Sequence, residues 1–366
     1  TAAAGNTDYG YISGGTPPYS SSVDRIDYSN DTANAVAKGP LAAVRRYLGA
    51  AGNATHGFFV AGITGSDYFS NINKIDYSND TATVPVTGNL SLARSHARGA
   101  GNSTYGYFGG GLSDGDDHST VDRVEYANDT GTSPTKGPLD IDRKKFSTVS
   151  SGSAGYYAGG EGSPSAGSSI SKIDFSNDTA TATPKGLMSS VRKCTAGTSS
   201  RDNAFSSSVR TQATRTEANS LPMGTNFGYM AGGGFPSKQS TVDRVDFTSD
   251  TSTMSPKGAL VEAITKQGES SSTSYGYFSG GEPGRSTVVR IDYSNDTATA
   301  ATKGPLSSSA EQGAGTGNDD YAYHSGRGAS GIDRIDYSND TATAATKGNL
   351  TRNSSNRAAA GSQSYG

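Results

Sequence analysis

Four polar side chains with metal-binding potential stand almost next to one another, at Asp114, Asp116, Asp117 and His118. Carboxylates at this density could hold Ca²⁺, which takes about six to eight oxygen ligands. The run D-G-D-D-H lacks the glutamate and the spacing of a calcium loop, however, and a solvated acidic loop explains it as well. We therefore assign no metal here and keep the four residues as candidate ligand contacts.

Residues suited to catalysis are sparse. The four histidines, His56, His96, His118 and His324, have no paired spacing that would suit zinc or copper. Cys194 is the single cysteine, which excludes an intrachain disulfide and a cysteine-based metal cluster. No Ser-His-Asp order, phosphate-binding loop or dinucleotide-binding glycine pattern is present. The sequence therefore predicts a protein that is not an enzyme and that uses no cofactor.

Aromatic residues within polar stretches are a second kind of candidate. Tyr19, Tyr68 and Phe69 have such surroundings. Exposed aromatic rings stack on sugars, whereas loop aromatics can also pack beneath their own loop, and the sequence leaves both readings open. Arg285, in the polar stretch 282–287, completes the set of candidate binding residues.

Composition narrows the class of protein. The 366 residues include 49 glycines and no tryptophan, and 31 basic against 34 acidic residues give a net charge of −3. The chain therefore lacks the excess of basic residues that is typical of proteins that bind nucleic acid or anionic lipid. No stretch approaches the ~20 apolar residues that span a bilayer, so we expect no membrane insertion. The long periodic runs of a helical bundle are also missing.

One phrase returns along the whole chain. Residues 290–306 read RIDYSNDTATAATKGPL, and residues 334–350 differ from them at one position. The acidic residue of the phrase marks each copy, at Asp27, Asp76, Glu125, Asp174, Asp246, Asp292 and Asp336. Successive spacings are 49, 49, 49, 72, 46 and 44 residues. Seven copies at this period indicate a repeat architecture, with one insertion of about 23 residues.

Each repeat has the same parts. An aromatic strand such as Tyr105–Gly111 ends in glycines, and a variable polar loop follows. Next comes an alternating strand such as Thr120–Tyr126, with the period of two that is typical of a half-buried strand. Ser-Asn-Asp supplies a tight turn, and Thr-Ala-Thr-Ala is predicted to begin the outer strand. Four short strands per repeat predict a blade of a β-propeller.

The repeat resembles the kelch repeat, with a strand that ends in a double glycine, a variable loop, a V-x-x-h-D/E-Y/F strand and an outer strand. The double glycines are Gly14–Gly15, Gly110–Gly111, Gly159–Gly160, Gly233–Gly234 and Gly280–Gly281. The motif is degraded to AGIT at 61–64 and to SGRG at 325–328. Alanine or threonine replaces the kelch tryptophan, as at Ala300 and Ala344, which predicts shallow outer-strand packing. The resemblance implies an all-β fold, a seven-bladed β-propeller of four-stranded blades over residues 1–366.

Two segments depart from the simple repeat. Residues 358–366 match residues 2–10 and read as the start of an eighth unit, which either helps to close the ring or continues into another part of the protein. The insertion lies within 188–227. It is rich in serine, threonine and arginine, and we consider it as a docking arm or as a plain surface loop; its basic residues are Arg192, Lys193, Arg201, Arg210 and Arg215.

The seven repeats differ from one another on one face of the predicted ring and are nearly identical on the other. The loops between second and third strands share one face with the connectors between blades, while the Ser-Asn-Asp turns lie on the other. The turns are nearly identical, whereas the loops differ freely, at 16–22, 63–73, 112–120, 161–171, 235–241 and 282–287. A uniform scaffold with variable loops on one face is what a recognition surface requires, although tolerated drift gives the same pattern.

Repeats of the DYSNDTATA…KGPL type also resemble those of virion structural proteins of marine bacteriophages, particularly phages of cyanobacteria. This resemblance implies a tail fibre, whisker or capsid-surface component on an extracellular particle, present in many copies. Its expected partners are other virion proteins and a host-surface glycan or protein. The alternatives are a secreted or cell-surface adhesin or lectin-like module and a purely structural collar that binds virion proteins alone.

Overall fold

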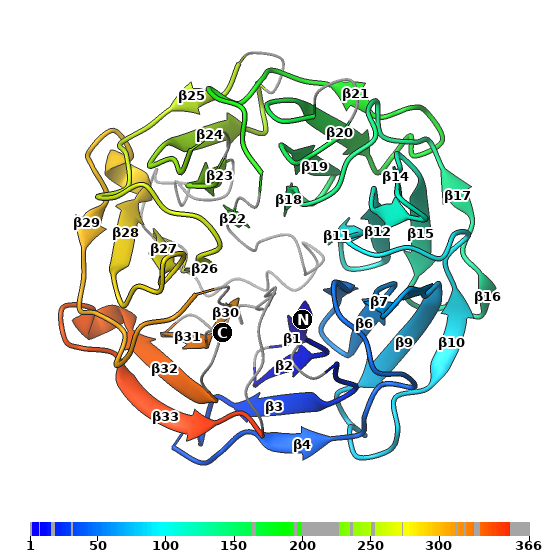
Figure 1. Ribbon diagram of the computed structural model, residues 1–366, viewed down its shortest axis with the longest axis horizontal. Helices are drawn as coiled ribbons and strands as arrows, with labels where there is room; N and C mark the ends of the chain where they lie inside the picture. The colour runs from blue at the N-terminus through cyan, green and yellow to red at the C-terminus, as the bar shows by residue number, and fades with distance from the viewer. Residues whose placement is uncertain are drawn as a thin grey trace, which may run out of the picture.

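The computed structural model shows a closed ring of seven β-sheets arranged around a central axis (Figure 1). It describes residues 2–351 except 7, 16–18, 31, 163–165, 194–195, 200–226, 235–236, 250–252, 273, 312–313, 318–319 and 326–329. The predicted start of an eighth unit, at 358–366, lies outside the described residues, as does most of the insertion.

Each blade consists of four consecutive antiparallel strands that run from the inner to the outer edge of the ring. The strands of the first three blades are β1 (Ala2–Gly5), β2 (Tyr9–Ser13), β3 (Val23–Asp27) and β4 (Val36–Lys38); β5 (Gly49–Gly52), β6 (His56–Val60), β9 (Asn71–Asp76) and β10 (Val86–Asn89); and β11 (Arg98–Gly101), β12 (Tyr105–Gly109), β15 (Val121–Glu125) and β17 (Thr135–Lys136). A short strand of the third blade, β16 (Gly131–Thr132), pairs in parallel with β10.

The other four blades repeat the pattern. Their strands are β18 (Ser147–Ser150), β19 (Ala154–Ala158), β20 (Ile170–Asp174) and β21 (Thr183–Pro184); β22 (Ala196–Ser199), β23 (Phe227–Ala231), β24 (Val242–Asp246) and β25 (Ser255–Pro256); β26 (Gly268–Ser271), β27 (Tyr275–Ser279), β28 (Val288–Asp292) and β29 (Ala301–Thr302); and β30 (Ala314–Gly317), β31 (Tyr321–Ser325), β32 (Gly331–Asp336) and β33 (Ala345–Asn349). The predicted all-β, seven-bladed propeller with four-stranded blades is therefore confirmed.

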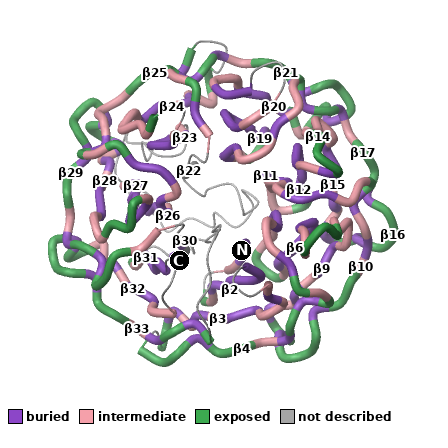
Figure 2. Tube along the Cα trace, in the orientation of Figure 1, coloured by how far each residue is buried: buried purple, intermediate pink, exposed green. Residues whose placement is uncertain are grey.

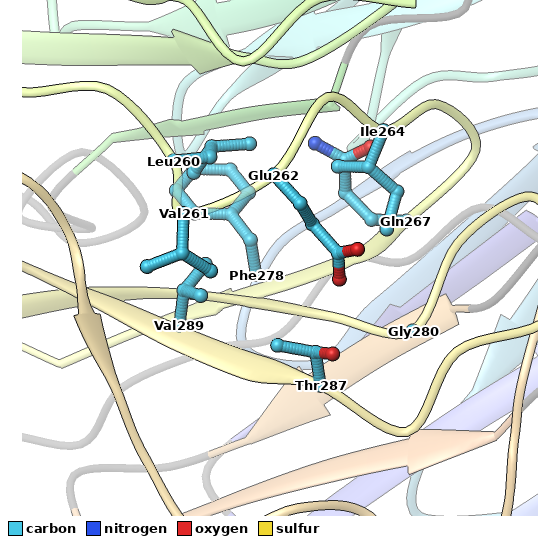
Figure 3. Close-up of a pocket in the computed structure, with 9 residues that line it drawn as sticks. All are labelled: Leu260, Val261, Glu262, Ile264, Gln267, Phe278, Gly280, Thr287 and Val289. Carbon is cyan, nitrogen blue, oxygen red and sulfur yellow. The ribbon is translucent and has the colours of Figure 1, made fainter.

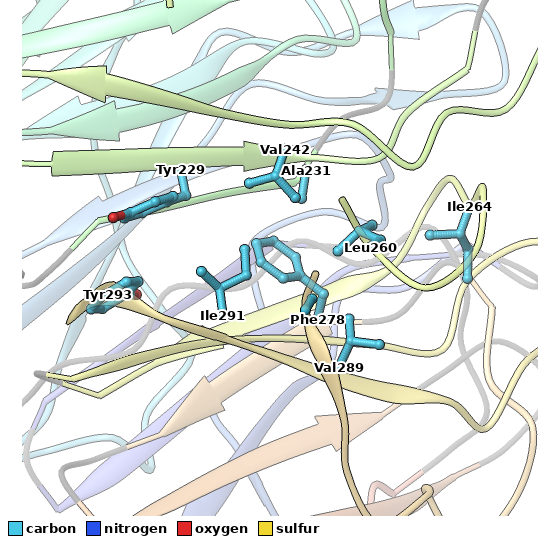
Figure 4. Packing of buried hydrophobic residues seen from close by; sticks show 10 residues of the cluster. Tyr229, Ala231, Val242, Leu260, Ile264, Phe278, Val289, Ile291 and Tyr293 are labelled. Carbon is cyan, nitrogen blue, oxygen red and sulfur yellow. The ribbon is translucent and has the colours of Figure 1, made fainter. Parts of the chain in front are cut away.

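The hydrophobic core lies between neighbouring blades. Tyr229 and Val242 of the fifth blade pack with Phe278 and Ile291 of the sixth in one buried cluster (Figure 4). Buried segments follow the second and third strands of each blade, while exposed segments lie at the outer edge (Figure 2). Because each strand contributes side chains to both of its faces, every blade is held by two such clusters, and the ring closes without a single common core.

Double glycines end the second strand of a blade with left-handed backbone. Gly110 and Gly111 have φ of 65° and 119°, and a Cβ on Gly110 would lie 2.7 Å from the Arg143 carbonyl oxygen. In the fifth blade the pair that takes this conformation is Gly232–Gly233, not Gly233–Gly234 as predicted. The sequence offers three consecutive glycines there, and strand register selects the first two.

The outer strands begin later than predicted. In the sixth blade the residues Thr297–Ala300 form turns and bends, and β29 begins only at Ala301. Ala300 itself is buried in the cluster shared with the fifth blade, beside Tyr229. This small side chain therefore brings the turn close to the neighbouring blade rather than starting a strand.

A repeated ionic contact joins neighbouring blades. The carboxylate of Asp80, in a turn of the second blade, accepts a hydrogen bond from the Tyr11 hydroxyl at 2.8 Å and contacts Arg25 at 2.8 Å and Lys38 at 3.0 Å, all from the first blade. We call this arrangement the blade clasp. It recurs at Asp178, with Tyr107, Arg123 and Lys136; at Asp296, with Tyr229, Arg244 and Lys257; and at Asp340, with Tyr277, Arg290 and Lys303.

The clasp explains why the repeated phrase is so uniform. The glycine after each lysine packs against the next blade's turn, where a Cβ on Gly304 would lie 1.6 Å from the Ala342 carbonyl oxygen. The Gly304 amide also donates to the Asp340 carbonyl at 2.8 Å. Aspartate, lysine and glycine of the phrase therefore hold blade to blade. Since tight turns prefer Asn and Asp, structure alone accounts for the Ser-Asn-Asp sequence.

The last blade closes on the first through contacts of the same kind as those between successive blades. The Ala35 amide donates to the Asn349 carbonyl at 2.7 Å, and the rings of Tyr28 and Tyr323 stack with centroids 5.1 Å apart. Gly348 lies against the turn at Ala33, as Gly304 lies against the turn at Ala342. The ring therefore closes by packing between its first and last blades.

Candidate binding face

Two sets of segments share one face of the ring, which we call the loop face. They are the loops between the second and third strands of each blade and the connectors that lead to the next blade. Backbone pairs tie the two sets together, as between Arg46 and Ile63, Ser95 and Leu112, Lys144 and Glu161, and Thr265 and Glu282. The backbone of the connectors thus holds the base of each of these loops, so the loop sequence can vary while the fold is kept.

Two of the variable loops are small hairpins. In the second blade β7 (Ile63–Thr64) pairs with β8 (Asp67–Tyr68), and in the third blade β13 (Leu112–Ser113) pairs with β14 (Asp116–Asp117). Asp114 and Gly115 form the tip of the second hairpin, with φ of 51° and 96°. Asp and Gly tolerate left-handed backbone best, so the D-G sequence is explained by the turn.

The predicted acidic cluster does not converge on one point. Asp114 and Asp116 are exposed at the hairpin tip, while Asp117 is half-buried and contacts Lys144 at 2.9 Å. The His118 amide donates to the Gly111 carbonyl at 3.0 Å, at the base of the loop. Among the residues that the structure describes, no three His, Cys, Asp or Glu side chains are placed to hold a metal ion. The cluster presents separate carboxylates on the loop face.

The predicted aromatic contacts lie in neighbouring blades. Tyr68 is half-buried on β8, while Phe69 and Tyr19 each lie against an arginine of the connector below. The guanidinium of Arg45 is 5.5 Å from the Phe69 ring centre, and that of Arg46 is 5.2 Å from the Tyr19 ring centre. All three rings keep part of their surface accessible, so packing and exposure coexist here.

Arg285 lies on the same face in the sixth blade, apart from the other candidates. It is exposed, and its Nε contacts the Glu262 carboxylate at 3.1 Å. The structure therefore brings the candidates of the first three blades onto adjacent loops and places Arg285 separately from them.

Sequence reasoning missed a set of residues at the inner rim of the loop face. Each stands two residues before an innermost strand and has left-handed backbone without being glycine; they are Tyr47, His96, Lys145 and Lys266, with φ of 57°, 59°, 54° and 60°. Such backbone is costly for side-chain-bearing residues and is often found at functional sites. Neither Asn nor Gly marks these positions, so no turn signal in the sequence could have found them.

Aromatic and ionic contacts hold the side chains of this rim in place. The rings of Tyr47 and His96 stack with centroids 4.0 Å apart. Burial and, after it, the positive charges of Arg98 and Lys145 lower the pKa of His96 to about 3, so its imidazole is neutral at pH 7. Glu161 contacts Lys145 at 2.8 Å and also pairs with Lys193. The rim thus combines a flat aromatic pair with paired charges.

The insertion begins with a residue that is part of the scaffold. Arg192 was predicted to belong to an arm or a surface loop, but it is completely buried and forms an ion pair with Asp243. Its position in the connector makes it equivalent to Arg94 and Arg143 of other blades, and burial there requires a partner. Arg201, Arg210, Arg215 and Cys194 lie outside the described residues.

The sixth blade has a small pocket beneath the loop face, lined by Leu260, Val261, Glu262, Ile264, Gln267, Phe278, Gly280, Thr287 and Val289 (Figure 3). It has room for about one water molecule. The pocket is therefore too small to hold a larger ligand. In the part of the chain that is described, no helix is long and apolar enough to cross a membrane.

Comparison with known proteins adds the fold alone. No protein-family model matches the chain, and no curated protein matches it. The solved chain described as "Structure of YjhT", a propeller, superposes with a TM-score of 0.61 at 11% sequence identity, covering 82% of this chain and 96% of that chain. The likeness supports the β-propeller architecture, which is compatible with a binding module.

Proposed function

We propose that this propeller is a non-enzymatic component of a virion appendage that recognises the host surface through its loop face. The observation that carries the proposal is the division of the ring into two unlike faces. Four turns of the opposite face are held by blade clasps, whereas the loops of the loop face differ in length and sequence. The resemblance of the repeats to virion proteins of marine bacteriophages is the reason for proposing a virion appendage.

The proposed contacts are accessible side chains on adjacent loops, one half-buried and two exposed. Tyr68 offers a ring for stacking on a sugar, and Asp114 and Asp116 offer hydrogen-bond acceptors at the tip of the neighbouring hairpin. Such contacts are individually weak because they are open to water. Many copies on one particle would raise the overall affinity by making later contacts intramolecular.

The proposal is tested with the full chain displayed in many copies on fluorescent beads and incubated with marine cyanobacterial cells, the host class that the resemblance implies. Tyr68→Ala and Asp116→Ala change the loop face, and Thr104→Ala changes an exposed position on the opposite face of the third blade. We expect the two loop-face variants to lower cell binding at least severalfold at unchanged melting temperature, and the control to bind normally.

Equal binding by all variants, or no binding by the wild-type beads to any cell or glycan array, would contradict host recognition by this face. Retention of the beads by other virion proteins from the same particle would favour the structural-collar alternative.

A further inference from the structure

One position in the connectors faces the third strand of the blade that follows. It is occupied by Arg45, Arg94, Arg143, Arg192, Ile264 and Ala310 in the connectors before the second to seventh blades. The facing position, three residues before the acidic marker of each repeat, is occupied by Asn73, Asp122, Ser171, Asp243, Val289 and Asp333 in the same order. The chain therefore holds several versions of one buried contact, which can be compared directly.

Three of the four arginines have a carboxylate partner or several hydrogen-bond acceptors, although the Nε of Arg143 and of Arg192, like that of Arg45, has no hydrogen-bond partner in the described part of the chain. Arg94 pairs with Asp122 at 2.8 Å and donates to the carbonyls of Gly110 and Phe108 at 2.7 and 3.0 Å. Arg192 forms its ion pair with Asp243. Arg143 has no carboxylate partner among the described residues, but it donates to the hydroxyls of Ser169 and Ser171. It also donates to the backbone carbonyls of Tyr157, Gly159 and Ser169.

Arg45 differs from all three. Its side chain is completely buried, yet it donates a single hydrogen bond, from Nη1 to the Ala61 carbonyl at 3.0 Å. Its Nε and Nη2 have no hydrogen-bond partner among the described residues. Burial lowers the pKa of Arg45 to about 10, so the group keeps its charge at pH 7. The neighbouring Phe69 ring, at 5.5 Å, supplies no negative charge.

The residue that faces Arg45 is the neutral Asn73. Its Nδ2 donates to the Val84 carbonyl at 3.2 Å, and its Oδ1 has no hydrogen-bond partner. The second blade thus buries a full positive charge where the third and fifth blades bury an arginine and a carboxylate together. A buried charge without a counter-charge costs several kcal/mol, roughly the cost of breaking a buried ion pair.

We propose that a small monovalent anion of the halide class, chloride under ordinary conditions, binds beside Arg45 in the second blade and replaces the missing carboxylate. A halide accepts hydrogen bonds from the free Nε and Nη2 and carries the single negative charge that the site requires. The site is structural, and it does not depend on the proposed function.

The first test measures the melting temperature of the full-length protein while chloride replaces gluconate at constant ionic strength. Asn73→Asp supplies a fixed carboxylate, and Asp122→Asn recreates the arrangement of the second blade in the third. We expect the wild-type melting temperature to rise by about 2 °C and, above the dissociation constant, to increase with the logarithm of the chloride concentration, as for binding to the native state alone. Asn73→Asp should lose this rise, and Asp122→Asn should enlarge it.

A wild-type melting temperature that responds to chloride no more than that of Asn73→Asp would overturn the proposal. Because a variant can fail to fold, the second test uses wild-type crystals grown in bromide. An anomalous peak in contact with Arg45 Nε or Nη2 is expected. Ordered water alone at that position, or bromide only at other sites, would show that the charge is hydrated rather than paired.

Discussion

Replacing Asp178 by alanine should destabilise the ring because one clasp loses its only acceptor. The carboxylate accepts from the Tyr107 hydroxyl at 3.0 Å and contacts Arg123 at 2.7 Å and Lys136 at 3.2 Å. Breaking a buried ion pair costs about 3–5 kcal/mol. Since the side chains of Arg123 and Lys136 are 23% and 13% exposed, water can recover part of this loss, and we expect about 3 kcal/mol.

Asp129 provides a matched control within the same molecule. It occupies the equivalent turn, but Lys74 at 3.1 Å is its single ionic partner among the described residues, because Phe58 and Thr87 stand where other clasps have tyrosine and lysine. Asp129→Ala should therefore cost about 1.5 kcal/mol, the lower end of the range for a single charged hydrogen bond.

The assay is urea unfolding followed by circular dichroism for the wild type and both variants. A difference of about 1.5 kcal/mol between the variants supports additive clasp contacts, and Tyr107→Phe should account for about 1 kcal/mol of it. Equal losses in the two variants would refute the reasoning, because the turn and not its partners would then set the stability.

Three further predictions concern stability. Gly304→Ala should lower the melting temperature strongly or prevent folding, because its Cβ would collide with the Ala342 carbonyl. Gly331→Ala is the control and should be tolerated, because its Cβ would meet no atom closer than 3.8 Å. In urea unfolding, Phe278→Ala should cost about 3–5 kcal/mol by leaving a cavity, whereas exposed Val261→Ala should cost less than about 0.5 kcal/mol. Burial would raise the pKa of the Asp80 and Asp178 carboxyls, but the hydrogen bonds and positive charges around them outweigh it and hold both pKa values below the usual value of 3.8. The stability that these two carboxylates contribute should therefore be present above about pH 4 and be lost as the pH falls below it, which melting temperatures between about pH 2 and pH 5 would show or disprove.

The fold could be predicted because residues close together in the sequence specify the strands and turns of each repeat. Alternating apolar residues specify the third strand of each blade, and the acidic marker at its end caps the turn, as when Asp27 accepts from the Ser29 amide at 2.9 Å. The start of the outer strands was placed too early, because Thr and Ala fit a strand by propensity. Contact of Ala300 with the neighbouring blade, which no local pattern reports, overrides that preference.

The candidate site could be predicted only in its loops. The sequence predicted that Asp116 and Tyr68 lie in variable loops, which the structure shows as two hairpins, whereas left-handed backbone at Tyr47 and His96 had no signal in residue type. The burial of Arg192 was missed for a related reason. An arginine in a serine-rich stretch reads as a surface residue until the facing Asp243 is placed beside it by the fold.

The most direct measurement is an electron-microscopy reconstruction of the native particle that carries this chain, at a resolution that orients the propeller. Host recognition by the loop face predicts that the hairpins with Tyr68 and Asp116 point outward, at the tip or outer surface of an appendage. A propeller whose loop face is buried between capsid, neck or tail proteins would contradict this account and assign the chain a structural role.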